Sequence, residues 1–190
     1  MAKFKITGVK RLTDYRWINL YEIEFVNSEG KKNTWVYSSR HAPKSKEFDA
    51  IVVIPIVPSP EGNKLILVKE WRFPIQNYEI HNIAGLVEDG EDIIEAARRE
   101  LMEEAGYELT KVTHVSPILI SSAGLSDEAV RVLFVECKPG PGQALEEHED
   151  IEVMLVDLEQ VREIMRNPPY PIDGKCWHTL LMYDQLGVIK

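Results

Sequence analysis

The feature that most constrains the fold is an amphipathic segment, EDIIEAARRELMEEAG, that ends at Gly106. Apolar residues recur every four positions from Ile93 to Ala105, which places them on one face of an α-helix. We expect Asp89 to be the N-cap of this helix and Gly106 to take the left-handed conformation after its last turn. The sequence therefore predicts a helix over about residues 91–105 whose apolar face is covered by another layer of the protein.

The same segment carries an unusual group of acids near its C-terminal end. Glu100, Glu103 and Glu104 share one face, because positions i, i+3 and i+4 are neighbours on a helix. Acids in the last turn oppose the helix dipole, at a cost of roughly 0.3–1 kcal/mol for each exposed residue. The cluster is either a solvated acidic surface or a cation site, and the broken helix rules favour the cation site. A hard ion such as Mg²⁺, which prefers carboxylate oxygens, would relieve the repulsion.

The composition narrows the classes of function. The chain has 190 residues and a formal net charge of −9, which fits one domain, or one domain with a small subdomain. An acidic chain is poorly suited to bind nucleic acid or an anionic membrane surface. No apolar run approaches about 18 residues, and the start lacks the apolar core of a signal peptide. Cys137 and Cys176 form no disulfide framework, so we expect a cytoplasmic protein. From the charge and the lack of a long apolar run, we expect neither a nucleic-acid nor a membrane partner.

Strand signals surround the acidic helix. Residues 16–25 alternate between apolar and polar, NSEG marks a turn and KKNTWVYSS follows, which together predict an N-terminal β-hairpin. IVVIPIV and KLILVKEW predict a second hairpin. Strands interspersed with helices and followed by them indicate an α/β (α+β) domain with a mixed sheet between helical layers. The other expected elements are strands near 78–84 and over 129–137 and 151–157, and helices over 158–167 and around 176–187.

The segment GLVEDGEDIIEAARRELMEEAGY (residues 85–107) resembles the Nudix box and matches it without a gap. Enzymes of the Nudix family hydrolyse nucleoside diphosphates linked to another group, using Mg²⁺ or Mn²⁺, and fold as an α/β/α sandwich. The resemblance implies that Arg99 orients the glutamates and that Glu91 supports the adjoining loop. The implied metal ligands are Glu100, Glu103, Glu104 and the backbone carbonyl of Ala84.

The resemblance also implies how a diphosphate would be cleaved. Metal ions neutralise the phosphoryl oxygens and lower the pKa of a bound water, whose proton a carboxylate then accepts. In similar enzymes this base lies on a mobile loop before a late strand, which is ALEEHEDIEV here. Alignment on IEV selects Glu149 as the base, with Glu103 or Glu104 as the alternative.

Outside the box, the stretches GKKNTW, VKEWR and SAGLSDE resemble the ADP-ribose pyrophosphatase branch of the family. This resemblance divides the chain in two. Residues 1–48 would form an N-terminal antiparallel β subdomain that mediates a domain-swapped homodimer and contributes to base stacking. Residues 49–190 would form the Nudix hydrolase domain.

The same resemblance assigns substrate contacts. Trp17 and Trp35 would stack on the adenine from the two subunits, and Arg40 and Arg72 would contact phosphate or the distal sugar. If the turn centres on the Ser-Glu step of NSEG, Trp35 lies opposite Glu22 and the two tryptophans point to opposite faces of the hairpin. An odd-length loop would place them on one face. Alternatively, the tryptophans are core or dimer-packing residues and the arginines form surface ion pairs.

Two departures from the branch pattern leave the substrate open. Ala123 stands where a proline is usual, and His81 and Ile83 stand in HNIAG where Glu-x-Pro-Ala-Gly is usual. We expect His81 to be a strand residue near the site. The leading hypothesis is hydrolysis of ADP-ribose or a related nucleotide sugar to a nucleoside monophosphate and a sugar phosphate. The alternatives are a GDP-mannose or UDP-sugar hydrolase, a nucleoside triphosphate pyrophosphohydrolase, and a non-catalytic nucleotide sensor.

Overall fold

A computed structural model describes residues 3–43 and 45–186, and the predicted last residue of the final helix, 187, lies outside them. The chain divides into two compact units. The first contains the chain up to Asp49 together with Ile118–Val130, and the second contains Ala50–Pro117 and the chain from Arg131 onward. Because the first unit takes in a later segment, the boundary between the units is not a single point in the sequence.

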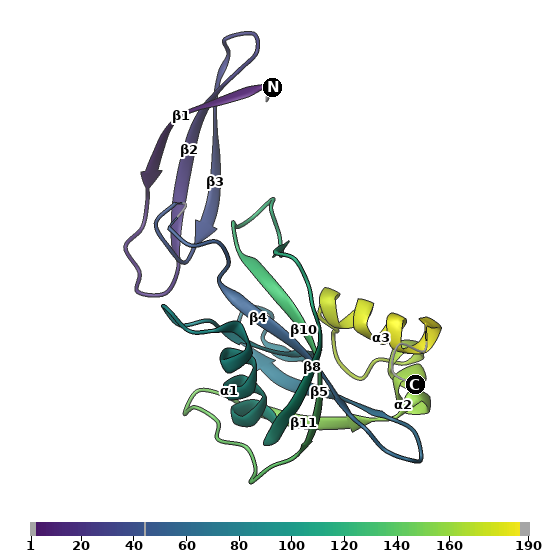
Figure 1. The fold of residues 1–190 in the computed structure, drawn as a ribbon. Coiled ribbons are helices and arrows are strands. Elements are labelled where there is room, and N and C mark those ends of the chain that lie inside the picture. The colour runs from purple at the N-terminus through teal and green to yellow at the C-terminus, as the bar shows by residue number, and fades with distance from the viewer. Residues whose placement is uncertain (1–2, 44, 187–190) are drawn as a thin grey trace. The chain divides into compact units, whose positions relative to one another are not determined.

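The first unit contains an antiparallel sheet in the order β1-β2-β3 (Figure 1). The predicted hairpin is confirmed as β2 and β3, whereas β1 was not predicted. The register between β1 and β2 shifts after Ile6, next to Gly8, so the apolar alternation in the first strand is broken. The strands are β1 (Phe4–Arg11), β2 (Asn19–Asn27) and β3 (Lys32–Ser39).

The turn of this hairpin contradicts the predicted register. Gly30 has φ 81° and donates its N–H to the carbonyl of Asn27, whose side chain accepts from the N–H of Lys31. These bonds make a three-residue loop, so Trp35 pairs with Ile23 rather than with Glu22. The argument for tryptophans on opposite faces of the hairpin therefore fails.

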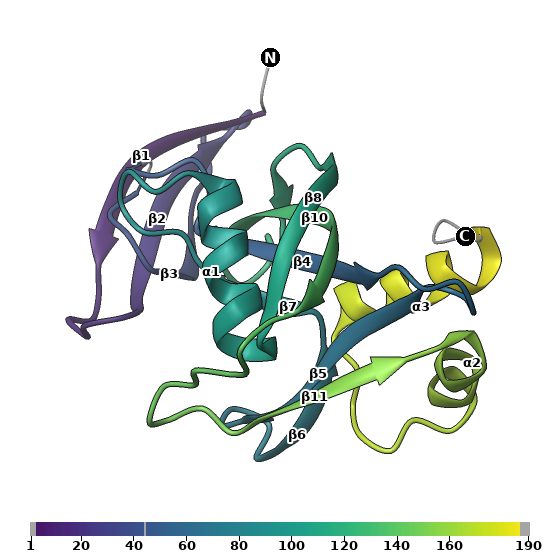
Figure 2. The ribbon, with the colours of Figure 1, turned by 60° about the horizontal axis from the view of Figure 1, so that its bottom comes forward.

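The second unit contains most of an eight-stranded sheet with the order β11-β5-β4-β10-β8, in which β6 pairs with β5 and β7 with β4. The short strand β9 pairs with the first two residues of β10, and this pairing lies within the first unit. Helix α1 covers one face, and α2 and α3 cover the other (Figure 2). The predicted α/β/α sandwich with an N-terminal antiparallel sheet is therefore confirmed. The strands are β4 (Ala50–Val57), β5 (Lys64–Arg72), β6 (Asn77–His81), β7 (Ile83–Leu86), β8 (Tyr107–Val115), β9 (Leu119–Ile120), β10 (Ala129–Pro139) and β11 (Ile151–Val156). The helices are α1 (Ile93–Ala105), α2 (Leu158–Arg166) and α3 (Gly174–Leu186).

Strand β5 shows why its sequence is continuously apolar. Leu65 and Leu67 lie in the core that contains side chains of α2 and α3. Ile66 and Val68 are also fully buried, and alternation along a strand turns them to the opposite face, where α1 packs. A strand covered on both faces needs apolar residues at successive positions. The predicted hairpin of β4 and β5 is confirmed, although the two strands pair with each other only at its end.

The two ends of helix α1 were predicted with different success. Gly106 has φ 71° and donates its N–H to the carbonyls of Leu101 and Met102, as expected for a helix end. The predicted N-cap, Asp89, is wrong. The N-cap is Asp92, which accepts from the N–H of Ile94, and the helix begins at the next residue, Ile93. Strand β8, which follows Gly106, was missed because only one of its nine side chains is buried and its apolar pattern is correspondingly weak.

We expect Gly106→Ala to lower the free energy of unfolding by roughly 1–3 kcal/mol, since the alanine would have to adopt a positive φ. Its Cβ would also lie 2.7 Å from the backbone nitrogen of Gln143. Gly30→Ala is the matched control, because Gly30 has a similar φ but open space around it. Urea denaturation should show the larger loss at Gly106, and equal losses would contradict the close contact.

Candidate active site

Arg99 organises the acidic face of helix α1. Its Nη1 lies 2.7 Å from Oε1 of Glu100 and 3.2 Å from Oε2 of Glu103. Its Nε lies 3.0 Å from Oε1 of Glu91, and its Nη2 donates to the carbonyl of Leu86. One guanidinium therefore joins the glutamates of the helix to the loop that enters it.

Glu91 completes this connection. Its Oε2 accepts both from Nη2 of Arg99 and from the backbone N–H of Glu88. The loop between β7 and α1 is thereby closed on itself and tied to the helix.

Glu104 is the buried member of the acidic cluster. Glu104 is 4% exposed, and its Oε2 is buried without a hydrogen-bond partner among the described residues. Burial, followed by the charges of Glu100, Glu70 and Glu149, raises the pKa of Glu104 to about 9, although a hydrogen bond from the backbone of Ala84 acts in the opposite direction. The carboxylate therefore needs either a proton or a cation.

Glu100 lies against the strand that precedes the loop. A Cβ placed on Gly85 would overlap the carboxylate of Glu100, so only glycine allows this approach. Burial raises the pKa of Glu100, as do the charges of Glu103 and Glu149, while Arg99 lowers it. The structure thus brings Glu100, Glu104 and the backbone at Ala84 and Gly85 into one region.

The loop between β10 and β11 covers the C-terminal end of α1. Gln143 donates to the carbonyl of Glu104, and the N–H of Ala144 donates to the carbonyl of Glu103. These bonds satisfy carbonyls that a helix end leaves without partners. Glu149 lies on the same loop, and its charge is among those that raise the pKa of Glu100 and Glu104. Its carboxylate is therefore close to the cluster.

Sequence reasoning missed Glu70 on strand β5. Oε2 of Glu70 lies 2.7 Å from Nε2 of His81 and 2.9 Å from Nη1 of Arg72. Burial alone would raise the pKa of Glu70, but these two partners outweigh it and lower the pKa below its ordinary value. A signal was present in the sequence, because alternation along β5 places Glu70 on the same face as the buried Ile66 and Val68.

The residues predicted to contact the substrate lie in the first unit, except for Arg72. Trp17 is 63% exposed and Trp35 is 50% exposed, so neither is a core residue of this chain. The guanidinium of Arg16 lies 4.4 Å from the centre of the Trp17 ring. Nη2 of Arg40 lies 3.7 Å from Glu128, while its buried Nε has no hydrogen-bond partner among the described residues.

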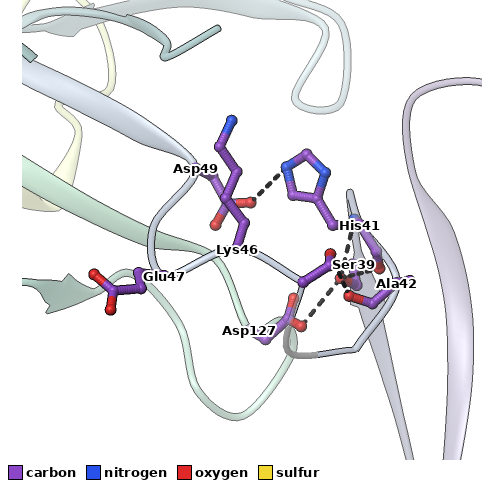
Figure 3. Close-up of a pocket in the computed structure, with 8 residues that line it drawn as sticks. Ser39, His41, Ala42, Lys46, Glu47, Asp49 and Asp127 are labelled. Carbon is purple, nitrogen blue, oxygen red and sulfur yellow. Dashed lines mark hydrogen bonds and ion pairs between the residues drawn. The ribbon is translucent and has the colours of Figure 1, made fainter. Parts of the chain in front are cut away.

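A small polar pocket lies in the first unit, and its side chains contact one another (Figure 3). Nε2 of His41 lies 3.2 Å from Oδ1 of Asp49, whose Oδ2 accepts from the N–H of Ala129. The hydroxyl of Ser39 lies 3.0 Å from Oδ2 of Asp127. These contacts fasten the end of β3 and the segment after it to the SAGLSDE stretch, which is a structural role.

The donor set at α1 fits a hard divalent cation. It consists of carboxylate oxygens, and one of them is buried without a partner at Glu104. In the part of the chain that the structure describes, no three acidic, histidine or cysteine side chains already converge as ligands. The carboxylates of Glu100 and Glu103 instead point toward the guanidinium of Arg99.

An α/β/α sandwich whose helix carries such a cluster defines a class of hydrolases that act with divalent metal ions. The NUDIX domain matches residues 49–175, and the chain belongs to the Nudix family. The predicted membership is confirmed, and the chain is a Nudix hydrolase. Nudix hydrolases generally need a divalent metal.

Two relatives cover most of the chain. An ADP-ribose pyrophosphatase of Saccharomyces cerevisiae is 32% identical in an alignment that covers 83% of this chain and 71% of the relative. An ADP-sugar pyrophosphatase of Mus musculus is 31% identical in an alignment that covers 76% of this chain and 72% of the relative. The crystal structure of an ADP compounds hydrolase shares the fold, with a TM-score of 0.76 at 18% identity, over 98% of this chain and 95% of that one.

The described helices include none with the length and apolar character needed to cross a membrane.

In the metal-free protein, Glu104→Gln should raise the free energy of unfolding at pH 8 by roughly 2–4 kcal/mol and change it little at pH 4. Because folding raises the pKa of Glu104 from 4.5 to about 9, the unfolded chain loses a proton that the folded state keeps. Stability therefore falls as pH rises between these values, and glutamine avoids this loss. Urea denaturation with a chelator measures the effect, and Glu95→Gln on the exposed side of α1 is the control. An equal effect of Glu104→Gln at both pH values would contradict it.

Proposed function

We propose that this protein hydrolyses the diphosphate bond of ADP-ribose or a related ADP-sugar with Mg²⁺ or Mn²⁺, releasing AMP and a sugar phosphate. The observation that carries the proposal is the buried Glu104 carboxylate, which has an unpartnered oxygen and lies within a cluster of acids on the Nudix helix. The names of the two relatives support the substrate class, because both act on ADP-sugars. GDP-mannose, UDP-glucose and nucleoside triphosphates are the competing substrates.

The metal would be held by Glu100, Glu103, Glu104 and the carbonyl of Ala84. Bound divalent ions supply charge neutralisation at the phosphoryl oxygens and lower the pKa of a coordinated water. Arg99 would hold the carboxylates of Glu100 and Glu103 together and oriented in the absence of metal, and Gly85 leaves room for the carboxylate of Glu100.

Glu149 would accept the proton of the attacking water. Its loop is bonded to the end of α1, and its charge is close enough to affect the pKa of both Glu100 and Glu104. Glu104 is less suited to this role, because without metal it holds its proton at neutral pH. Glu103 is engaged by Arg99.

The N-terminal part, residues 1–48, would contribute the base-binding tryptophans and the contacts of a domain-swapped homodimer, with residues 49–190 as the hydrolase domain. Trp17 and Trp35 are available for stacking because both are largely exposed. Arg40 and Arg72 would contact phosphate or the distal sugar. A cytoplasmic homodimer would cover the large apolar side chains that the first unit exposes, which include Phe4, Ile6, Val9, Leu12, Tyr15, Leu20 and Val36.

A substrate panel tests the proposal. With Mg²⁺, the protein should convert ADP-ribose to AMP and ribose 5-phosphate faster than it acts on GDP-mannose, UDP-glucose or dGTP. Glu104→Gln should lower kcat by about a hundredfold or more, with a smaller effect on binding, because it removes a metal ligand. Glu95→Gln should leave kcat unchanged. Tight ADP-ribose binding without turnover would indicate a sensor, and faster dGTP cleavage would indicate a triphosphate hydrolase.

Trp17→Ala should raise KM for ADP-ribose by roughly tenfold with less effect on kcat, because base stacking contributes to binding rather than to the reacting phosphate. Trp177→Ala is the control, since Trp177 is a partly exposed tryptophan on α3. Steady-state kinetics measure both variants. An unchanged KM in the Trp17 variant would contradict stacking of the substrate base on Trp17.

A further inference from the structure

His81 is a buried histidine whose two ring nitrogens both face oxygen atoms. Its side chain is 8% exposed, Nδ1 lies 2.7 Å from the carbonyl oxygen of Asn82, and Nε2 lies 2.7 Å from Oε2 of Glu70. A carbonyl only accepts, so Nδ1 carries a proton. Nε2 is buried and makes no hydrogen bond with the described residues, so its 2.7 Å approach to Oε2 of Glu70 is its closest recorded polar contact.

The carboxylate of Glu70 also accepts hydrogen bonds from Arg72. Nη1 of Arg72 lies 3.0 Å and 2.9 Å from the two carboxylate oxygens of Glu70, and Nε of Arg72 lies 3.5 Å from Oε2 of Glu79. Charged hydrogen bonds of this kind fix the plane of a guanidinium. The Arg72 side chain is 48% exposed, and its Nη2 donates no hydrogen bond within the described chain. One donor of a fixed guanidinium is therefore left for a ligand.

The burial of Glu70 makes its neutralisation important. Its side chain is 15% exposed, and its charge reaches Glu104. An unpaired carboxylate at this position would add negative charge to the acidic cluster of α1 and would repel a diphosphate. Arg72 supplies the positive charge beside Glu70, and His81 contacts the same carboxylate from strand β6.

We propose that His81 and Glu70 are positioning residues that hold the guanidinium of Arg72 in place for a phosphate of the substrate. The inference rests on the proposed function, in which Arg72 contacts phosphate or the distal sugar, and it adds two residues that act through Arg72. His81 acts on the Glu70 carboxylate, and that carboxylate acts on Arg72. Neither of the two residues touches the substrate.

A double-mutant cycle on the whole chain tests this proposal with ADP-ribose and Mg²⁺. His81→Gln should raise KM by roughly three- to tenfold with a smaller change in kcat, since an amide cannot reproduce the contact of the ring with the Glu70 carboxylate. Arg72→Ala should raise KM further. Adding His81→Gln to Arg72→Ala should then have no additional effect. His114→Gln is the control, because His114 is an exposed histidine on β8, and it should leave KM unchanged.

Two results would overturn the proposal. One is an unchanged KM in a His81→Gln variant whose thermal melt shows that it is folded. The other is the same rise in KM with and without Arg72, which would mean that His81 acts independently of the arginine. If His81→Gln fails to fold, Glu70→Gln replaces it in the cycle, with the same expected pattern and the same contradictory results.

The proposal can also be separated from the proposed function. If the wild-type protein cleaves none of the nucleotide sugars, the proposed function fails, and the position of Arg72 is then measured in the free protein. In NMR spectra of protein labelled with ¹⁵N-arginine, the Arg72 guanidinium signal should be sharp in the wild type and broadened in the His81→Gln variant. Identical signals would overturn the positioning role.

Discussion

The burial of Glu104 is the constraint on which the rest of the site depends. Glu104 lies three and seven positions after Leu101 and Ala97, so it shares the helix face that packs on the sheet. The same packing that anchors α1 therefore removes a carboxylate from water. Such a group is stable only when a proton or a cation neutralises it, which links the fold directly to metal-dependent chemistry.

Arginine side chains near Glu104 pair with the other acids of the site. Arg99 pairs with the more exposed acids and with Glu91 in the entering loop. On strand β5, Glu70 brings another carboxylate to the same region, and its two partners, His81 and Arg72, lie on the neighbouring β6 and at the end of β5 itself. The site is thus a set of acids in which each carboxylate other than Glu104 and Glu149 has a nearby cation to limit repulsion.

The sequence predicted the parts of the fold that have a strong local pattern. Helix α1, the β4–β5 hairpin and the sandwich follow from apolar periodicity and from glycine at a helix end. Strand β8 was missed because it is mostly exposed, and β1 because its pattern is interrupted at Gly8. The N-cap was misplaced because Asp89 and Asp92 are chemically equivalent candidates, and the structure selects Asp92, which accepts the N–H of Ile94.

By itself, the sequence determined that three glutamates share the face of one helix, since helical spacing alone brings them together. Only the tertiary structure decided that Glu104 is buried, that Glu100 lies against Gly85 and that Glu70, His81 and Arg72 meet. These relations depend on which strands pair and which helix face is covered. Desolvation and charge pairing act through space, so they cannot be obtained from spacing along the chain.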